Sequence, residues 1–432
     1  MRAWEYASVP TLPGQAPQPT IFDSSKGEKT LTKTPQNTAS LYVCGITPYD
    51  ATHMGHASTY VAFDVLHRAW LDAKIPVTYV QNVTDVDDPL LERAEATGVN
   101  WEDLAQEQIE LFRSDMQALN VIAPTHYIGA VESIPWVIEA VTELLAKNLA
   151  YTVPGYTEEN GTTHPDGDIY FDIKAAEHYA PADPEHWKLG DISGLTREQM
   201  LNIFGERGGD PQRPGKRDEL DPLLWRVHRE GEPAWDSATL GKGRPGWHIE
   251  CTTIAQKFLP SPFTVQGGGS DLQFPHHDMG AGHAYTLNDK PMAHHYVHTG
   301  MVGLDGEKMS KSLGNLVLVS TLRKEGTNPN VIRLAIMSNH YCSDWFWTED
   351  LLEKAQQRYK LYQQALSCAL SEETDEEAQI LVQDVRALLA DDLNTPEALE
   401  RIDQWAHHIC HNGGKGGKLV RDLLEARLGI SC

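Results

Sequence analysis

The segment from residue 41 to residue 86 alternates between strand-like and helix-like patterns in a way that few folds accommodate. LYVCG (41–45) is a short apolar strand, residues 58–73 repeat apolar side chains with helical spacing, and PVTYVQNVTDV (76–86) is a β-branched strand. Strand, helix and strand in this order predict a βαβ unit, and therefore an α/β protein with a parallel sheet. The loop after residue 45 then lies at the carboxyl end of the first strand, where anionic ligands bind.

Similar patterns return later in the chain, and its length of 432 residues exceeds what one compact core usually holds. Residues 246–258 have helical spacing, FTVQGGG (263–269) and residues 294–304 are strand-like, and the chain from about 320 onward is mostly helical. We predict five parts: an N-terminal arm and lead-in (1–40), the first half of a nucleotide-binding catalytic domain (41–117), an inserted connective subdomain rich in Gly, Pro and Asp (118–222), the second half of the catalytic domain (223–320) and a helical C-terminal domain (321–432).

Charge and composition narrow the partners that the chain is expected to have. The 61 acidic and 36 basic residues give a net charge of −25, whereas nucleic-acid binding normally needs a basic face. No stretch approaches the roughly 18 apolar residues of a membrane span, and the N-terminus has no signal-peptide pattern. Six scattered cysteines are typical of a reducing compartment. We therefore expect a cytoplasmic monomer that contacts neither tRNA nor a membrane.

Two motifs, each placed directly after a predicted strand, have side chains that suit phosphate. In HMGH (53–56) two imidazoles lie one turn apart at a helix start, although such a pair is more often a surface feature or a metal pair. In KMSKS (308–312) two ammonium groups on a Gly-rich loop would neutralise charge on a departing phosphate, although a solvated basic turn is the usual alternative. Their occurrence together favours phosphate chemistry.

HMGH and KMSKS resemble the two defining motifs of the class I aminoacyl-tRNA synthetases. Six further segments of the sequence are similar to the cysteine-specific branch of that family: YVCG (42–45), NVTDVDD (82–88), LLWR (223–226), GWHIEC (246–251), GGGSDLQFPHH (267–277) and HTG (298–300). The resemblance runs from about residue 41 to residue 320. It implies a Rossmann-like class I synthetase catalytic domain with an inserted subdomain and a helical C-terminal domain. The implied activity is formation of cysteinyl-adenylate from cysteine and ATP.

Two further segments resemble the mycothiol ligases, which join cysteine to the amine of glucosaminyl-inositol in mycothiol biosynthesis. GITPYDATH (45–53) departs from the CGPTVYD sequence that is usual in cysteinyl-tRNA synthetases, and ERGGDP (206–211) resembles a ligase motif. The chain also ends soon after the shared helical segment DDLNTPEALE (391–400), so we expect no anticodon-reading domain. The resemblance implies an ATP-dependent carbon–nitrogen ligase whose small-molecule partners are cysteine, ATP and glucosaminyl-inositol.

The same resemblance implies one Zn²⁺ per chain, held by Cys44, Cys251 and His276. Sequence spacing alone does not reveal this site, because a single buried cysteine is usually a small hydrophobic residue. The family's fourth ligand, a glutamate, corresponds here to Gly280. This leaves three ligands and an open position, unless another protein group replaces the glutamate. Zinc favours thiolate over hydroxyl, which would distinguish cysteine from serine without an editing site.

The resemblance also implies substrate contacts. His53 and His56 contact ATP phosphates, Lys308 and Lys311 close over the departing pyrophosphate, and Mg²⁺ accompanies ATP. Trp247 packs beside the amino-acid pocket, with a plain core tryptophan as an equal alternative. Further residues expected to contact cysteine or the adenylate are Cys44, Gly45, Ile46, Thr47, Thr59, Asn82, Val83, Thr84, Gly269, Ser270, Asp271 and Val302. We interpret Asp85, Asp87 and Asp88 as a solvated acidic turn.

Two other functions stay open at this point. One is a cysteinyl-tRNA synthetase that lacks an anticodon-binding domain, and the other is an inactive paralogue that binds zinc or nucleotide. Transfer of cysteine to tRNA rather than to a sugar amine would identify the first. Failure to catalyse cysteine-dependent exchange of pyrophosphate into ATP would identify the second.

Overall fold

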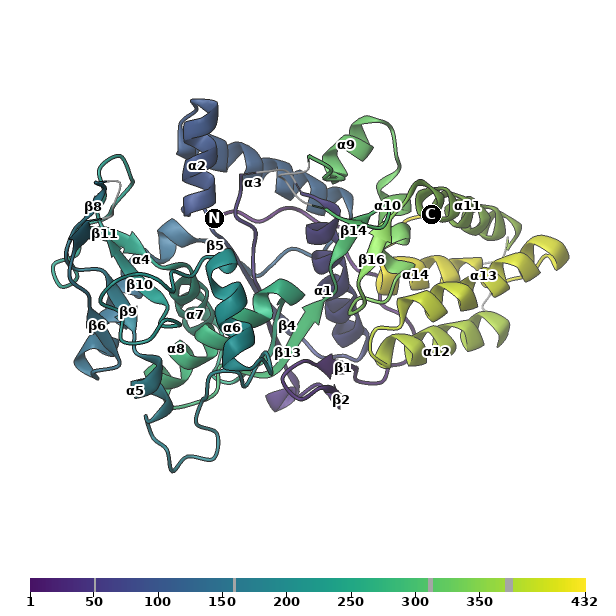
Figure 1. The fold of residues 1–432 in the computed structure, drawn as a ribbon. Helices are drawn as coiled ribbons and strands as arrows, with labels where there is room; N and C mark the ends of the chain where they lie inside the picture. Colours follow the sequence, from purple (N-terminus) through teal and green to yellow (C-terminus); the bar gives the residue numbers. More distant parts are fainter. Residues whose placement is uncertain (50–51, 158–160, 310–313, 370–375) are drawn as a thin grey trace.

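The centre of the molecule is a five-stranded parallel sheet (Figure 1). The structure is a computed structural model that describes residues 1–49, 52–157, 161–309, 314–369 and 376–432. The strand order is β13-β12-β3-β4-β5, and the strands are β3 (Ala39–Val43), β4 (Val77–Val83), β5 (His126–Gly129), β12 (Phe263–Gly269) and β13 (Ala293–Thr299). All four neighbouring pairs are parallel, which confirms the predicted α/β class.

Helix α1 (Met54–Asp72) connects β3 to β4 and begins earlier than the expected start at residue 58. The reason is a cap, because the Nδ1 atom of His53 accepts hydrogen bonds from the backbone N–H groups of Gly55 and His56, at 3.1 and 3.4 Å. Such a cap satisfies N–H groups that have no partner inside the helix. The HMGH motif therefore forms the first turn of the helix and points the helix N-terminus toward the carboxyl end of β3.

A second sheet, antiparallel, packs at one side of the molecule. Its order is β11-β10-β9-β6, with β6 (Ala150–Thr152), β9 (Ile169–Phe171), β10 (Leu223–Val227) and β11 (Gly243–Pro245). Strand β5 belongs to the main sheet although it lies inside the range 118–222, and β10 and β11 belong to the small sheet although they follow residue 222. Each expected boundary of the inserted subdomain, near residues 118 and 222, therefore assigns strands of one sheet to two different parts of the chain. The division of the chain into five domains stays a prediction.

The expected strand 294–304 is interrupted at Gly300 and Met301. Its first part is β13, whereas β14 (Val302–Leu304) leaves the main sheet and pairs with β15 (Glu307–Lys308) and β16 (Trp345–Trp347). Gly300 lies so close to the chain of the next loop that an added Cβ atom would be 2.1 Å from the Ser343 carbonyl oxygen. This close approach, which needs glycine, redirects the chain into the three-stranded sheet of β14, β15 and β16, whose strand β15 ends shortly before residue 310.

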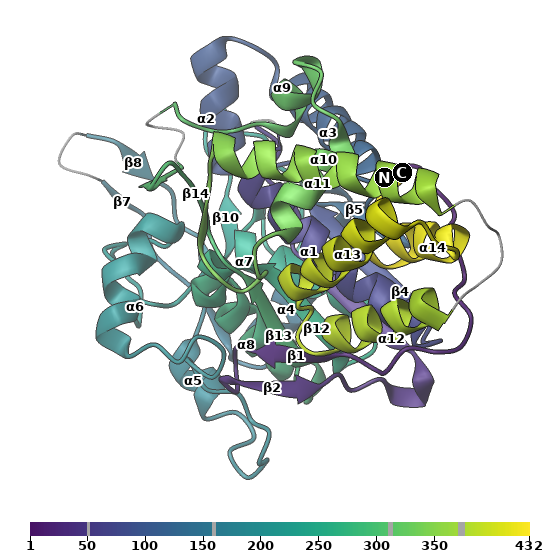
Figure 2. The same ribbon diagram turned by 90° about the vertical axis from the view of Figure 1, so that its right-hand side faces the viewer.

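Five helices from the C-terminal part of the chain form a group that appears in front of α1 in Figure 2. They are α10 (Pro329–Met337), α11 (Glu349–Cys368), α12 (Glu376–Ala390), α13 (Thr395–Asn412) and α14 (Gly417–Leu428). Helices α10, α12 and α14 contact α1, and α11 and α13 pack against these helices. Asp64 of α1 accepts a hydrogen bond from Arg68 at 2.7 Å and another from Arg333 of α10. Asp72 accepts two from Arg386 of α12, at 2.7 and 2.8 Å. These buried ion pairs join the helical part to the sheet domain.

The remaining elements surround these layers. The hairpin of β1 (Thr20–Asp23) and β2 (Glu28–Leu31) lies beside β13. The other helices and strands are α2 (Asp88–Thr97), α3 (Trp101–Ala118), α4 (Ala130–Ala146), β7 (Tyr156–Thr157), β8 (Thr163–His164), α5 (Ile173–Glu177), α6 (Arg197–Phe204), α7 (Trp247–Phe258), α8 (Asp278–Asn288) and α9 (Val319–Lys324). None of the helices in the described part of the chain has the length and apolar character that a membrane span needs.

Candidate active site

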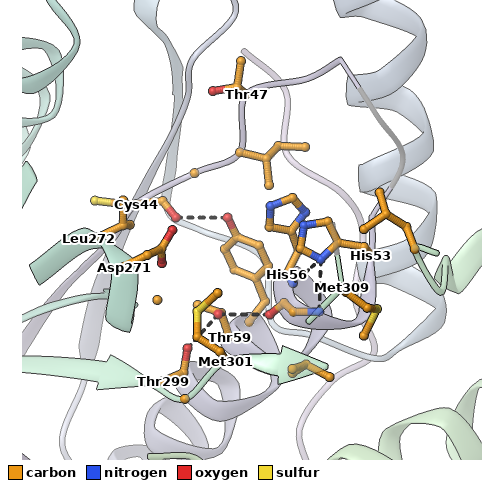
Figure 3. A pocket seen from close by; sticks show the side chains of 18 of the residues that line it. Cys44, Thr47, His53, His56, Thr59, Asp271, Leu272, Thr299, Met301 and Met309 are labelled. Carbon is orange, nitrogen blue, oxygen red and sulfur yellow. Dashed lines mark hydrogen bonds between the residues drawn. The ribbon is translucent and has the colours of Figure 1, made fainter. Parts of the chain in front are cut away.

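A pocket of ≈ 380 Å³ opens at the carboxyl ends of β3, β12 and β13 (Figure 3). Open parallel sheets bind ligands at this edge because loops and helix N-termini gather there. The structure places most of the residues expected to contact substrate in the wall of this one pocket: Cys44, Gly45, Ile46, Thr47, His53, His56, Thr59, Trp247, Gly269, Asp271 and Val302. These residues are spread over more than 250 positions of sequence, so the pocket is assembled by the fold and not by one local motif.

The two histidines of HMGH form one side of the pocket. Their rings stack with centroids 3.7 Å apart and lie side by side in Figure 3. Because the Nδ1 atom of His53 caps α1, only the Nε2 edge of that ring is directed away from the helix backbone. Ring N–H groups beside a helix N-terminus form a favourable environment for a phosphate group.

Hydrogen bonds fix the floor of the pocket. The hydroxyl groups of Thr59 and Thr299 are 2.8 Å apart, and the Tyr60 hydroxyl donates to the carbonyl oxygen of Cys44 at 3.0 Å (Figure 3). Tyr60, Thr299 and Met301 also line the pocket and were not predicted from the sequence. Thr299 was identifiable as the residue before the glycine of HTG at a strand end. Tyr60 has only the pattern of a buried helix face, which gives no signal of a site.

Residues Asn82, Val83 and Thr84 lie behind the pocket and do not line it. The Gly45 N–H donates to the Asn82 side-chain oxygen at 2.7 Å, and the Thr84 N–H donates to the Ile46 carbonyl at 3.0 Å. An added Cβ atom on Gly45 would lie 1.7 Å from the Asn82 carbonyl oxygen. These residues therefore hold the loop after β3 in place. Their expected contact with the adenylate, like that of Ser270, which is also absent from the lining, stays a prediction.

The KMSKS loop is described only in part. Lys308 forms the end of β15, and Lys311 lies outside the described residues, as does the Lys308 side chain. Met309 and Leu316, on either side of residues 310–313, both line the pocket. The loop therefore starts and ends at the pocket, and the roles expected for the two lysines stay predictions.

Cys44, Cys251 and His276 meet behind the pocket wall. Their ligand atoms lie within 4.8 Å of one another and all three residues are buried. Cys44 follows β3, Cys251 is on α7 and His276 is in the bend before α8. A tetrahedral zinc ion with Zn–S bonds of about 2.3 Å separates two sulfur ligands by about 3.8 Å, so the spacing suits zinc. Among the described residues, this group contains three potential ligands. Gly280 has no side chain and therefore adds no side-chain ligand.

The sulfur atoms are surrounded by neutral imidazoles. The Nε2 atom of His277 is 3.3 Å from the Cys44 sulfur, and its Nδ1 atom is 2.7 Å from the Nε2 atom of His298. The Nδ1 atom of His248 is 3.1 Å from the Nδ1 atom of His276. Burial lowers the pKa of His277 and His248, and lowers the pKa of His298 to about 3. These rings are therefore uncharged and hold the ligand side chains in fixed orientations.

The two thiols affect each other strongly. A hydrogen bond from the Cys44 thiol, followed by the nearby His276, lowers the pKa of Cys251, while burial and Cys251 raise the pKa of Cys44. The pair therefore favours one thiol and one thiolate. A bound cation would favour ionisation of both sulfurs. Nearby, the Glu250 Oε2 atom is buried without a hydrogen-bond partner among the described residues. The donor set fits a metal ion that prefers sulfur and nitrogen.

The interpretation of Asp85, Asp87 and Asp88 as a solvated acidic turn was wrong for Asp85 and Asp87, whereas Asp88 is exposed. Asp85 is buried, its Oδ1 atom accepts from the Val131 N–H at 2.9 Å, and burial raises its pKa to about 6. Asp87 caps α2, and burial likewise raises its pKa to about 6. Asp88 forms an ion pair with Arg244. Asp85 turns inward because the strand ends beneath the start of α4, whose N–H groups need acceptors.

Comparison with known proteins shows which protein family has this architecture. The family model described as the class I (C) tRNA synthetase catalytic domain matches residues 30–357. Among solved structures, the Mycobacterium tuberculosis methionyl-tRNA synthetase in complex with methionyl-adenylate is similar, with a TM-score of 0.59 and 16% identity. The similarity covers 91% of this chain and 92% of that one. At this identity the likeness concerns the fold.

Relatives with much higher identity share the whole length. A protein of Rothia mucilaginosa is 60% identical over 437 residues, covering 100% of this chain and 96% of that protein. A protein of Kocuria rhizophila is 57% identical over 440 residues, covering all of both chains. Both are named L-cysteine:1D-myo-inositol 2-amino-2-deoxy-alpha-D-glucopyranoside ligase. The chain therefore belongs to the class I synthetase family and, within it, to the group of these cysteine ligases.

Proposed function

We propose that this protein is an ATP-dependent ligase that activates L-cysteine as cysteinyl-adenylate and transfers it to the amine of glucosaminyl-inositol. The reaction releases pyrophosphate and then AMP and leaves an amide. The observation that carries the proposal is the position of Cys44, which lines the HMGH pocket and also belongs to the Cys44–Cys251–His276 group. An amino acid held by its sulfur at that group lies beside the pocket for the nucleotide. The names of the full-length relatives support the same substrates.

Cys44, Cys251 and His276 would hold one Zn²⁺ ion, since three sulfur and nitrogen donors meet there within tetrahedral reach. When bound, zinc supplies a position that binds a thiolate strongly and a hydroxyl weakly, which separates cysteine from serine. Apolar packing alone discriminates poorly between such similar side chains. Gly280, which has no side chain where the family has a glutamate ligand, would leave room on the ion for the substrate sulfur.

The chain's own groups orient the reacting atoms. Trp247, whose ring centroid is 4.6 Å from that of His276, forms the wall beside the cysteine. His53, His56 and the N-terminus of α1 bind the phosphates of Mg-ATP, so that the cysteine carboxylate can attack the α-phosphate. Lys308 and Lys311 neutralise the departing pyrophosphate. The acceptor amine then attacks the carbonyl carbon of the adenylate.

We further propose that the protein acts as a cytoplasmic monomer on small molecules and without tRNA. The net charge of −25 supports this, because a tRNA partner would require a basic surface. Six free cysteines, two of them in the proposed zinc site, suit a reducing compartment.

The deciding experiment offers the purified protein both acceptors. Labelled cysteine and ATP are incubated with either glucosaminyl-inositol or tRNA, and the labelled products are separated. We expect a labelled amide with the amino sugar and no labelled tRNA. Charged tRNA without amide would establish the tRNA enzyme instead. Absence of cysteine-dependent exchange of pyrophosphate into ATP would indicate an inactive paralogue.

A further inference from the structure

A second group of metal-ligating side chains lies where three segments of the chain meet, and none of its members lines the active-site pocket. His340 and Cys342 are in the loop between α10 and β16, and Asp392 is in the turn between α12 and α13. Their ligand atoms lie within 4.8 Å of one another. The Cys342 sulfur is 3.1 Å from the Nδ1 atom of His340, whose Nε2 atom is 3.9 Å from Asp392 Oδ2.

The Asp392 carboxylate is held in a fixed orientation. Its Oδ1 atom accepts hydrogen bonds from the Tyr341 hydroxyl at 2.6 Å and from the Phe22 N–H at 2.7 Å. Its Oδ2 atom faces His340. Asp392 and Leu393 have φ angles of +59° and +52°, a region that side chains other than glycine rarely adopt. Such a strained backbone persists only where the surroundings determine it, and here it keeps a buried carboxylate beside a thiol.

A cysteine, a histidine and an aspartate together suit either a reactive nucleophile or a metal ion, and the structure favours the metal. The Nε2 atom of His340 and the Oδ2 atom of Asp392 are 3.9 Å apart, which is longer than the hydrogen bond that orients a catalytic histidine. The ligand atoms of all three residues lie within 4.8 Å of one another, a spacing that one ion can bridge. A divalent cation would bind one nitrogen of the His340 imidazole, the Cys342 sulfur and the Oδ2 atom of Asp392 at once.

We propose that His340, Cys342 and Asp392 bind a second, solvent-accessible divalent ion of the zinc class, with water completing the coordination. Cys342 is exposed, so an ion can enter from solvent without unfolding the chain. Lys29 interacts electrostatically with Asp392 and Cys342, but its ion pair, at 2.9 Å, is with Asp391. The site therefore differs from the buried Cys44–Cys251–His276 group, and the ion it holds exchanges more readily.

The position of this site connects it to the adenylate pocket. The Tyr341 carbonyl accepts from the Gly300 N–H at 2.8 Å, and the Asp344 carboxylate accepts from the Met301 N–H at 2.7 Å. Gly300 and Met301 both line the pocket. An ion bound to His340 and Cys342 fixes the loop that carries these acceptors. The ion thus holds one wall of the pocket in place and joins it to the β1–β2 hairpin and to the α12–α13 turn.

The test uses the full chain with the sulfur ligands of the first site removed. The parent variant is Cys44→Ser/Cys251→Ser, freed of metal with a chelator and titrated with Co²⁺. We expect one Co²⁺ per chain with thiolate-to-metal charge-transfer absorption. Adding Cys342→Ser should abolish that absorption and weaken binding more than about 10-fold, as loss of a ligand exceeds loss of an outer-shell partner. Adding Cys368→Ser instead, a partly buried cysteine elsewhere, should change neither.

Two further measurements keep the result decisive. Zn²⁺ should raise the melting temperature of the parent and of the Cys368→Ser control. It should not raise the melting temperature of the Cys342→Ser variant or of a His340→Asn variant. Two ligand variants are used so that one remains informative if the other folds poorly. Zn²⁺ should also protect Cys342 from alkylation by iodoacetamide. The proposal is overturned if the parent gives no thiolate absorption, or if Cys342→Ser leaves it unchanged. Rapid alkylation that Zn²⁺ does not slow would overturn it in favour of a reactive cysteine.

Discussion

Two buried polar regions next to helix α1 differ in how their charges are balanced. At the interface with the C-terminal helices, each buried carboxylate faces arginines: Asp64 pairs with Arg68 and Arg333, and Asp72 pairs with Arg386 and Arg427. These arginines lower the pKa of both aspartates despite their burial. In the Cys44–Cys251–His276 group, the two sulfur atoms lie beside imidazole rings, and no lysine or arginine pairs with them among the described residues.

The difference separates a structural region from a binding region. Buried charged groups that pair with each other within the chain need no bound ligand to be stable. Buried metal-ligating atoms that face one another are instead stabilised when a cation binds between them. Changes in the first region should therefore alter stability and leave metal binding intact. Changes in the second should alter metal binding and activity and leave most of the stability intact.

The largest expected effect is on stability, in the arginine-paired region. Asp64→Ala leaves Arg68 and Arg333 buried without their carboxylate, so the free energy of unfolding should fall by about 3–5 kcal/mol. Denaturant titration measures this. Lys354→Ala, which removes the exposed pair with Asp350, is the control and should have almost no effect. A loss for Asp64→Ala no larger than that of the control would contradict the structural role.

The next effect is on activity, in the metal-ligating region. Cys251→Ser should abolish stoichiometric zinc and reduce cysteine-dependent exchange of pyrophosphate into ATP more than about 1,000-fold, since even outer-shell changes reduce activity about 10- to 100-fold. Metal analysis and the exchange assay check both. Cys410→Ser, a partly buried cysteine on α13, serves as the matched control and should retain zinc and activity. Unchanged zinc and turnover in Cys251→Ser would refute the metal site.

A smaller effect on activity is expected from the KMSKS loop. Lys311→Ala should slow adenylate formation about 100-fold, because one positive charge no longer stabilises the departing pyrophosphate. Zinc content and the unfolding free energy should stay at the wild-type values. Single-turnover measurement of adenylate formation tests this. Loss of zinc together with the rate would show that the loop acts through the fold and not on the phosphate.

The smallest effect compares, across pH, Asp64, which pairs with arginines, and Asp85, which accepts a hydrogen bond from a backbone N–H group. Burial raises the pKa of Asp85 to about 6, so the folded protein binds that proton more tightly than the unfolded chain does. Its ionisation therefore destabilises the fold as pH rises from about 4 through 6. Asp85→Asn should stabilise by about 1 kcal/mol at pH 7 and not at pH 4. Ionisation of Asp64 has the opposite effect on stability, because its pKa is lowered in the folded protein. The stabilisation of the fold by ionised Asp64 is therefore lost only as pH falls below about 4. Equal effects at both pH values would contradict this.

Local patterns were enough to predict several elements of the fold. The strand predicted at 263–269 is β12, and the helix predicted at 246–258 is α7 from Trp247. The break at Gly300 and the place of β5 in the main sheet were not predictable, because both depend on contacts with distant segments. Asp85 also turned inward for a reason that lies in another helix. A run of three acidic residues in four positions gives no sign of that.

The site was predictable only by resemblance. Cys44, Cys251 and His276 are separated by 207 and 25 positions, and no spacing rule connects them. The structure brings their ligand atoms together because β3, α7 and the bend before α8 converge at one edge of the sheet. Tyr60, which completes the floor, has a side chain that the sequence does not distinguish from a core residue, whereas Thr299 is marked only by its place before the glycine of HTG.

The most direct test of the central claim is the zinc content of the purified enzyme together with its choice between cysteine and serine in pyrophosphate exchange. If Cys44, Cys251 and His276 hold zinc beside the nucleotide pocket, a stoichiometric ion should be present, and its removal should abolish activation of cysteine. Serine should be activated at a small fraction of the cysteine rate. Metal-free enzyme that activates both amino acids equally well would contradict the account.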